Sequence, residues 1–356
     1  MIELHNVECL EFMRGMDANS VDAIVTDPPY FGVKDDDWDN QWKNAEHFIA
    51  WIVELSEQWQ RILKPNGSLY CFASPRMAAR VEVKIAERFN ILPTIVWMKQ
   101  DAAGNGISNR SDITGLRSFF PQSERIIFAE HYGADNIAKG EAGYTAKCDQ
   151  LRGFVFEPLR AYLVDEFNRS GIDKIQFNVI CGFSASAGGM ASRHYLSQSQ
   201  WCLPTFEHYH KLREATGRFQ RPYEDLRREY EDLRREYEDL RRPFNVTADV
   251  PYTDVWTFKT VQAYEGKHVC EKPLALMEHI ILASTRPNAL VFDPFTGSGS
   301  TGVAAVLNGR RFIGCEKDAK HYQNALRRIR KYQSQPRMFA PEPPPKPEQL
   351  SIDPAA

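Results

Sequence analysis

The pattern that most constrains the fold is an alternation of short apolar runs with helical segments, interrupted once by a long middle stretch. The apolar runs expected to form strands are 21–26, 68–72, 95–98, 125–129, 290–292 and 312–314. The segments expected to form helices are 45–63, 76–88, 276–283, 301–307 and 322–332. Strands that alternate with helices at this spacing indicate βαβ units. The chain is therefore expected to form an α/β fold on a largely parallel sheet.

Length and composition limit the class of protein. The chain has 356 residues, of which 43% are hydrophobic, so a sizeable core is expected in either two domains or one large domain with an insertion. No apolar run reaches the ~20 residues of a membrane span. The first residues lack the basic and apolar regions of a secretory signal. The seven cysteines contain no Cys-x-x-Cys pair, which favours reduced thiols and a cytoplasmic protein.

The middle stretch divides the chain into four expected parts. Residues 1–130 and 266–332 carry the α/β pattern, and residues 131–265 form an insert rich in Gly, Arg, His and aromatic residues. Residues 333–356 are Pro-rich and lack periodicity, so a disordered tail is expected there.

One internal repeat lies inside the insert. The heptad Tyr-Glu-Asp-Leu-Arg-Arg-Glu begins at Tyr223 and recurs at 230–236 and, without its last residue, at 237–242. This period of seven places Tyr and Leu on the a and d positions. Pro222 and Pro243 bound the run, and Glu-to-Arg pairs four residues apart support a helix. A helix over 222–242, ~30 Å long, is therefore expected. It serves as a coiled-coil dimer contact, as a spacer that sets the reach of the insert, or as a solvated amphipathic helix packed on its own domain.

A glycine-rich segment, Asp293–Thr301, follows an apolar run and opens a helix. Gly297 and Gly299 let the backbone turn tightly and approach a ligand, and the free N–H groups of a helix start favour an anionic group. Glu316 ends the next expected strand, where an α/β nucleotide site places an acid for the ribose hydroxyls. This order favours a nucleotide-like cofactor over a simple tight turn between strand and helix.

The second motif, Asp27-Pro28-Pro29-Tyr30, ends the first apolar run. Taken alone, it is typical of a turn. The motif is suited to one reaction in particular, the transfer of a group to a planar exocyclic amine. The lone pair of such an amine is delocalised into a ring, which makes the nitrogen a poor nucleophile. The Asp27 carboxylate and the Pro28 carbonyl can accept the two N–H bonds and draw that lone pair towards an electrophile. The prolines hold the carbonyl rigidly, and Tyr30 can stack on the ring.

Together the two motifs resemble the S-adenosylmethionine-dependent DNA amino-methyltransferases, specifically their permuted beta group. In that group the Asp-Pro-Pro-Tyr half precedes the recognition region and the glycine-rich half follows it, as here. Further segments that resemble the family are Asn66–Leu69, Val96–Lys99, Ser123–Ala129, Glu271–Leu274 and Phe312–Glu316. The resemblance covers about residues 1–130 and 266–332. It implies a Rossmann-like class I methyltransferase sheet, circularly permuted, with an inserted target-recognition region at 131–265.

The resemblance also implies roles for individual residues. The methionine end of S-adenosylmethionine is expected by the Gly297–Gly299 loop, and its ribose is expected by Glu316. The other residues expected in the cofactor site are Asp293, Phe295, Lys272, Pro273 and Glu8. Glu8 stands where the family often has the Asp of a Gly-Asp pair, so an acid is kept with one methylene more. The expected catalytic set is Asp27, Pro28, Pro29 and Tyr30, acting by direct in-line transfer on a base flipped out of the duplex.

The first residue of the Asp-Pro-Pro-Tyr motif bears on the choice of base. Asp at this position, rather than Ser, resembles adenine-N6 enzymes more than cytosine-N4 enzymes. The expected function is site-specific methylation of adenine N6 in double-stranded DNA, with cytosine-N4 methylation as the alternative. A catalytically inactive DNA-binding module is a second alternative, against which the intact motifs argue. A homodimer and a companion restriction endonuclease are partners that the sequence leaves open.

Contacts to DNA must come from local groups, because a formal charge of −3 argues against binding through overall charge. Basic residues are available in the Gly/Asn/Ser-rich loop at 102–115 and in the insert. The insert residues expected to contact DNA are Arg152, Arg193, Lys211, Arg213 and Arg218. Each reads guanine, contacts phosphate or is a solvated surface charge. Cys202, His208 and His210 fit no zinc spacing, so no metal site is expected.

Overall fold

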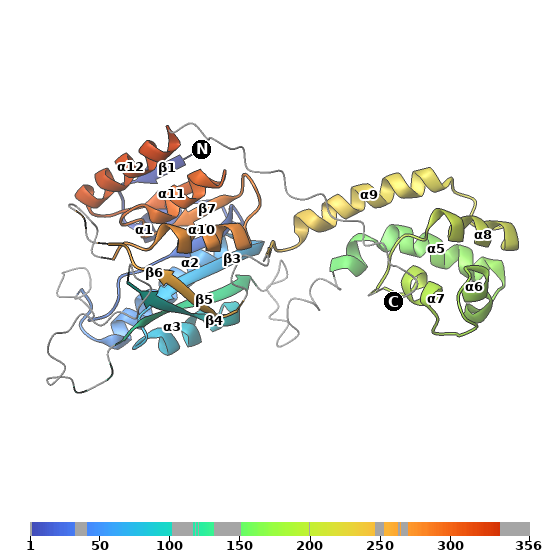
Figure 1. The fold of residues 1–356 in the computed structure, drawn as a ribbon, viewed down its shortest axis with the longest axis horizontal. Helices are drawn as coiled ribbons and strands as arrows, with labels where there is room; N and C mark the ends of the chain where they lie inside the picture. The colour runs from blue at the N-terminus through green and yellow to red at the C-terminus, as the bar shows by residue number, and fades with distance from the viewer. Residues whose placement is uncertain are drawn as a thin grey trace. The chain divides into compact units, whose positions relative to one another are not determined.

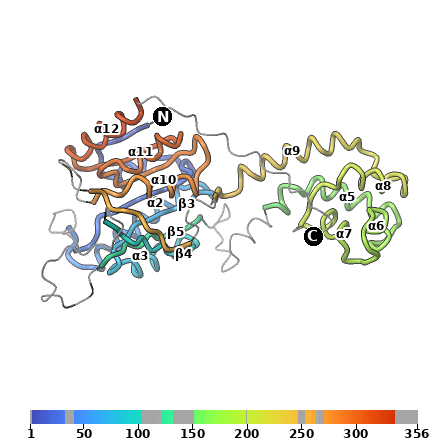
Figure 2. Tube along the Cα trace, in the orientation of Figure 1, coloured from blue at the N-terminus to red at the C-terminus, as the bar shows by residue number. Residues whose placement is uncertain are grey.

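The computed structural model describes residues 2–32, 41–101, 117, 119, 121–131, 151–198, 200–245, 253–262, 264 and 270–334. The loop at 102–115 and the tail beyond residue 334, both named in the sequence analysis, lie outside these residues. The chain divides into two compact units, one of residues 1–138 with 243–356 and one of residues 139–242 (Figures 1 and 2).

The first unit is built on an eight-stranded sheet of described residues, in the order β1-β8-β7-β2-β3-β5-β4-β6. The strands are β1 (Ile2–His5), β2 (Val21–Thr26), β3 (Leu63–Ala73), β4 (Phe89–Gln100), β5 (Ser123–His131), β6 (Val255–Lys259), β7 (Leu290–Asp293) and β8 (Arg311–Cys315). Neighbouring strands are parallel except for the two pairs that include β5. The expected largely parallel sheet is therefore confirmed. β5 reverses direction because the sequence between β4 and β5 has no helical pattern, and antiparallel neighbours need no crossover helix.

The pairing of β2 with β7 joins the two halves of the α/β pattern. Ile24 of β2 lies opposite Phe292 of β7 in a parallel register. The Asp-Pro-Pro-Tyr motif follows β2, and β7 ends at Asp293. Because the two strands run in the same direction, their carboxyl ends meet at one edge of the sheet. Two motifs that lie far apart in the sequence therefore become neighbours in space.

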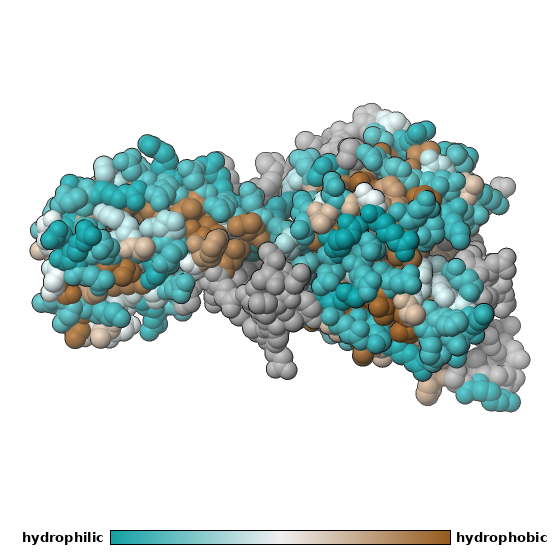
Figure 3. Space-filling view, turned by 180° about the vertical axis from the view of Figure 1, so that it is seen from behind, coloured by the Kyte–Doolittle hydropathy of each residue, from teal (hydrophilic) through white to brown (hydrophobic). Residues whose placement is uncertain are grey.

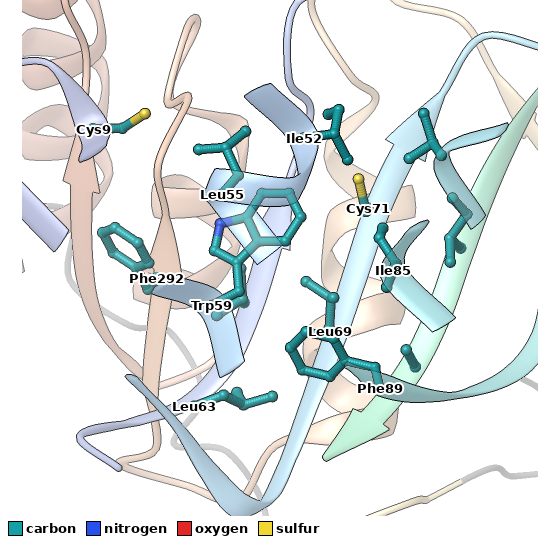
Figure 4. Close-up of a cluster of buried hydrophobic side chains, with 14 of the residues drawn as sticks. Cys9, Ile52, Leu55, Trp59, Leu63, Leu69, Cys71, Ile85, Phe89 and Phe292 are labelled. Carbon is teal, nitrogen blue, oxygen red and sulfur yellow. The ribbon is translucent and has the colours of Figure 1, made fainter. Parts of the chain in front are cut away.

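Helices cover both faces of this sheet (Figure 1). They are α1 (Cys9–Arg14), α2 (Ala45–Ile62), α3 (Ala78–Ala86), α10 (Leu274–Ser284), α11 (Ser300–Leu307) and α12 (Ala319–Gln333). One hydrophobic cluster includes residues of α1, α2 and α3, and a second includes residues of α10, α11 and α12. Trp59 of α2 is fully buried and lies within the first cluster, near Leu55 and Phe292 (Figure 4). The helical spacing expected at 45–63 is thus confirmed.

The second unit is helical and has its own core. Its helices are α5 (Glu157–Ser170), α6 (Lys174–Ile180), α7 (Met190–Leu196), α8 (Phe206–Thr216) and α9 (Tyr223–Leu240). Helix α9 is formed by the heptad repeat, and its Leu226 and Tyr237 are buried in the cluster of this unit. Tyr230 and Leu233 pack against the same cluster. The apolar face of the repeat is therefore used inside its own unit, which fits the interpretation of a packed amphipathic helix.

The boundaries of the units differ from the expected insert. The second unit ends at Arg242, whereas the insert was expected to run to residue 265. Strand β6 lies between residues 242 and 265 and pairs with β4, with Trp256 opposite Trp97.

Hydrophilic residues dominate the visible face of each unit in Figure 3. Within the part of the chain that the structure describes, no helix is long and apolar enough to cross a membrane.

Candidate active site

A cleft of about 830 Å³ is lined by the residues that follow β2, β7 and β8. This volume is typical of a site for a small molecule. Ten of the twelve residues predicted as catalytic or cofactor-binding line it: Glu8, Asp27, Pro28, Pro29, Tyr30, Lys272, Asp293, Phe295, Gly297 and Glu316. The other two, Pro273 and Gly299, cap the beginnings of α10 and α11. The strand order thus brings both motifs to one cleft.

The glycine-rich loop is braced by Glu316. The N–H of Gly297 donates to Oε2 of Glu316 at 2.9 Å, and the N–H of Asp318 donates to Oε1 at 2.9 Å. Each carboxylate oxygen keeps a further lone pair that can accept a hydrogen bond from a ligand hydroxyl. Gly297 and Gly299 have φ of 49° and 81°, a left-handed region that favours glycine. A Cβ at Gly299 would also lie 3.2 Å from the Cβ of Ala325 on α12.

Asp293 ties the two ends of this loop together. Its carboxylate accepts the hydroxyl of Thr301 at 2.6 Å and the N–H of Phe295 at 3.0 Å. Burial raises the pKa of Asp293 to about 7, although both hydrogen bonds act in the opposite direction. Asp293 therefore fixes the loop and lines the cleft at once.

Arg328 of α12 holds the loop from the other side, a role that the sequence analysis missed. Its guanidinium donates to the carbonyl of Ser298 at 3.1 Å and to Oγ of Ser300 at 3.3 Å. It also pairs with Oε1 of the buried Glu271 at 2.9 Å. Ser300 in turn donates to the carbonyl of Lys272 at 2.9 Å. These contacts fasten the glycine loop to the segment that carries Lys272.

The Asp27 carboxylate is held at both oxygens. The hydroxyl of Tyr30 donates to Oδ1 at 2.8 Å, and the ammonium of Lys272 pairs with Oδ2. Lys272, predicted as a cofactor residue, thus contacts the predicted catalytic aspartate as well as lining the cleft. Burial raises the pKa of Asp27, and Lys272 opposes that rise. Burial also raises the pKa of Tyr30, so its hydroxyl stays protonated and can donate.

Glu124 and Lys99 complete the surroundings of Asp27, and neither was predicted as a site residue. Oε2 of Glu124 lies 3.3 Å from the ammonium of Lys272 and 3.2 Å from the hydroxyl of Tyr30. Its Oε1 lies 2.5 Å from the ammonium of Lys99. Burial acts to raise the pKa of Glu124, but Lys272 and Lys99 outweigh it and hold this pKa below its ordinary value.

The direction of β5 explains why Glu124 was missed. Because β5 is antiparallel to β3 and β4, its first residues lie at the edge where those strands end. If β5 followed the parallel direction of most of the sheet, His131 would lie there instead. The available signal was a glutamate just before the apolar run at 126–129.

The residues predicted to contact DNA lie in the second unit, and the side chains of four of the five make the following contacts there. Lys211 pairs with Glu207 at 2.6 Å, and the Arg152 guanidinium lies 5.7 Å from the centre of the Tyr237 ring. The guanidiniums of Arg193 and Arg213 donate to the Gly188 carbonyl and the Gln220 side chain, each at 3.3 Å. Arg218 is exposed. Their contact with DNA stays a prediction. Among the residues considered for zinc, His208 has its Nδ1 2.7 Å from the Tyr195 hydroxyl.

Known proteins are similar to this chain in sequence and in fold. A family model described as DNA methylase, of the N6 and N4 group, matches residues 21–327. The type II methyltransferase M2.MboI of Moraxella bovis is 41% identical over 347 residues, which cover 91% of this chain and 86% of the relative. The DNA adenine methyltransferase YhdJ of Escherichia coli is 27% identical over 327 residues, which cover 90% and 80% of the two chains.

Among solved structures, the cytosine-N4-specific PvuII DNA methyltransferase has a TM-score of 0.51 at 11% identity, covering 95% of this chain and 87% of that chain. This likeness confirms the class I methyltransferase fold, while its circular permutation stays a prediction. The family expected from the two motifs is confirmed by the matched model and by the Moraxella relative. The chain belongs to the DNA methylase family.

Proposed function

We propose that this protein is a site-specific DNA methyltransferase that transfers a methyl group from S-adenosylmethionine to N6 of adenine in duplex DNA. The observation that carries this proposal is the single cleft shared by Asp27, Tyr30, Gly297 and Glu316. Family membership supplies the reaction class. The relative named as a DNA adenine methyltransferase favours adenine over the cytosine-N4 alternative.

The lining of the cleft fits S-adenosylmethionine, which supplies a methyl group activated by a positively charged sulfur. The carboxyl groups of Glu8, Asp293 and Glu316 make the cleft suited to a cationic ligand. Glu316 keeps lone pairs for ribose hydroxyls while it braces the glycine loop. Phe295 adds an aromatic surface to the same lining. These residues would hold the group beside the Asp-Pro-Pro-Tyr motif.

The chain's own residues position the target amine. The base must leave the duplex to reach the cleft. Asp27 accepts a hydrogen bond from one N–H of the amino group through a free lone pair. The Pro28 carbonyl accepts a hydrogen bond from the other N–H. The hydroxyl contact of Tyr30 with Asp27 fixes the tyrosine ring where it can stack on the base. Such alignment of reactants supplies an effective ~7–11 kcal/mol in favourable cases.

A methyl-transfer assay with radiolabelled S-adenosylmethionine tests the proposed activity. Wild-type protein should label duplex DNA, and Asp27→Ala and Asp27→Asn should not, while both variants still bind the cofactor. Asp17→Asn, at an exposed position outside the cleft, is the matched control and should keep full activity. If wild-type protein binds cofactor and DNA but labels no DNA, the inactive binding module replaces this proposal.

Target recognition and assembly belong to the same proposal. The helical second unit supplies the contacts that select the DNA site, and the predicted basic residues act there. The sequence leaves open whether the protein forms a homodimer and whether it acts with a companion restriction endonuclease. Sedimentation of the protein with and without a duplex tests the dimer, and a mixture that stays monomeric at micromolar concentration contradicts it.

A further inference from the structure

Four charged side chains of alternating sign form a row beside the Asp-Pro-Pro-Tyr motif. Lys99 contacts Glu124, Glu124 contacts Lys272, and Lys272 contacts Asp27. Lys99 comes from the end of β4, Glu124 from the start of β5 and Asp27 from the end of β2, so the sheet edge assembles the row. Lys272 lies in the middle, between two carboxylates.

The row is largely buried, so an unpaired charge within it would be energetically costly. The Lys272 side chain is only 8% exposed and that of Glu124 12%, whereas that of Lys99 is 25% exposed. Buried charges are tolerated when they are paired, and removal of one partner leaves the other uncompensated. The charges of the two carboxylates and the two ammonium groups in this row add up to zero. An Asp27–Lys272 pair would already be neutral, so neutrality alone does not require Glu124 and Lys99.

We propose that Lys272 and Glu124 are positioning residues for the methyl transfer. Lys272 holds Oδ2 of Asp27, so that Oδ1, which accepts the Tyr30 hydroxyl, directs its remaining lone pair towards the target amine. Because the Lys272 ammonium also pairs with Glu124, it withdraws less negative charge from Asp27. Asp27 therefore stays a strong hydrogen-bond acceptor. This inference rests on the proposed function, since it concerns the orientation of Asp27 towards the amino group.

The titratable and charged groups that face Asp27 affect the pH at which this carboxyl group gains a proton, and thus the pH dependence of methyl transfer. They are Lys272, Tyr30 and Glu124, with Cys71 of β3 and Asp293 of β7 acting at longer range. Burial raises the pKa of both Cys71 and Tyr30, so these two groups stay neutral near pH 7. Glu124 is faced by Lys272, Lys99, Tyr30 and Asp27. Asp293 is unchanged in all the variants below, so a difference between variants reports on the row itself.

The test is the pH dependence of single-turnover methyl transfer in the full-length protein. On the acidic limb of this profile, the rate falls as Asp27 gains a proton. In Glu124→Gln the loss of a negative charge beside Asp27 should move this acidic limb to lower pH. In Lys272→Met the loss of a positive charge should move it to higher pH, by about one unit or more. Lys272→Arg keeps the charge and should restore most of the wild-type limb. Opposite shifts are not expected from loss of packing alone.

Lys99→Gln provides a second variant at the exposed end of the row, in case Lys272→Met does not fold. Without Lys99, Glu124 draws more strongly on Lys272, so the acidic limb should again move to higher pH. Limbs that coincide with wild type in Glu124→Gln and Lys99→Gln, while Asp27→Asn stays inactive, overturn the positioning role and leave the proposed function intact. Absence of DNA methylation by wild-type protein overturns the proposed function itself.

Discussion

The N–H of Gly297 donates a hydrogen bond to Oε2 of Glu316 at 2.9 Å, which links the glycine loop to the acid at the end of the neighbouring strand. Loop geometry and recognition of a ribose therefore depend on one carboxylate. Glu316→Ala should weaken binding of S-adenosylmethionine by roughly 10- to 100-fold, since hydrogen bonds to charged groups contribute about 1.5–3 kcal/mol. Calorimetric titration measures this change. An unchanged dissociation constant would remove Glu316 from the cofactor site.

A side chain at Gly299 should be unfavourable, for two separable reasons. Its φ of 81° is left-handed, and a Cβ there would lie 3.2 Å from Ala325. Gly171 is the matched control, because its φ is 74° but a Cβ added there would have no neighbouring atom within 4 Å. Each alanine variant should lose about 1–2 kcal/mol of unfolding free energy to backbone strain. Only Gly299→Ala should also weaken cofactor binding, and equal binding by both variants would contradict the account.

The pKa of Asp293, raised by burial to about 7, predicts a pH-dependent stability. A carboxyl group with a raised pKa in the folded state binds its proton more tightly there than in the unfolded chain. Its contribution to stability is therefore present below the ordinary pKa and is lost as the pH rises towards 7. Urea unfolding of wild type between pH 4 and 7 should lose up to ~1.4 kcal/mol per pH unit relative to Asp293→Asn. Parallel curves for the two proteins would be inconsistent with the raised pKa.

Two leucines of the heptad repeat should respond differently to the same substitution. Leu226 is fully buried in the core of the helical unit, whereas Leu240, at the equivalent heptad position, is 46% exposed. Leu226→Ala should lower the unfolding free energy by about 2–5 kcal/mol, and Leu240→Ala by less than about 0.5 kcal/mol. Circular dichroism in urea measures both. A concentration-dependent loss in Leu240→Ala would point instead to a coiled-coil contact between copies.

Sequence reasoning succeeded where a local pattern carried the physics. The spacing at 45–63 predicted α2, and the order of apolar run, glycine-rich segment and helix predicted the turn from β7 into α11, with Glu316 at the end of β8. It failed where direction or exposure decided the outcome. Glu124 reaches the site because β5 runs antiparallel. Strand β6 went unpredicted because it lies at the sheet edge with Val255 half exposed, so its apolar signal is weak.

Side-chain partners were the least predictable part of the site. The order of motifs indicated that Lys272 lies near the cofactor, but only the folded sheet shows its contact with Asp27. Arg328 reaches the loop from α12, and nothing in the helical pattern distinguishes it from neighbouring arginines. In the same way, identical heptads give no signal that Leu226 is buried and Leu240 is not. These differences arise from tertiary packing, which local sequence does not encode.

The most direct test of the central claim is a nucleoside analysis of duplex DNA methylated by the purified protein. DNA is incubated with S-adenosylmethionine, digested and separated by chromatography with mass detection. The account predicts N6-methyladenine in wild-type reactions and none with Asp27→Asn. N4-methylcytosine as the only modified base would contradict the assignment of adenine as the target.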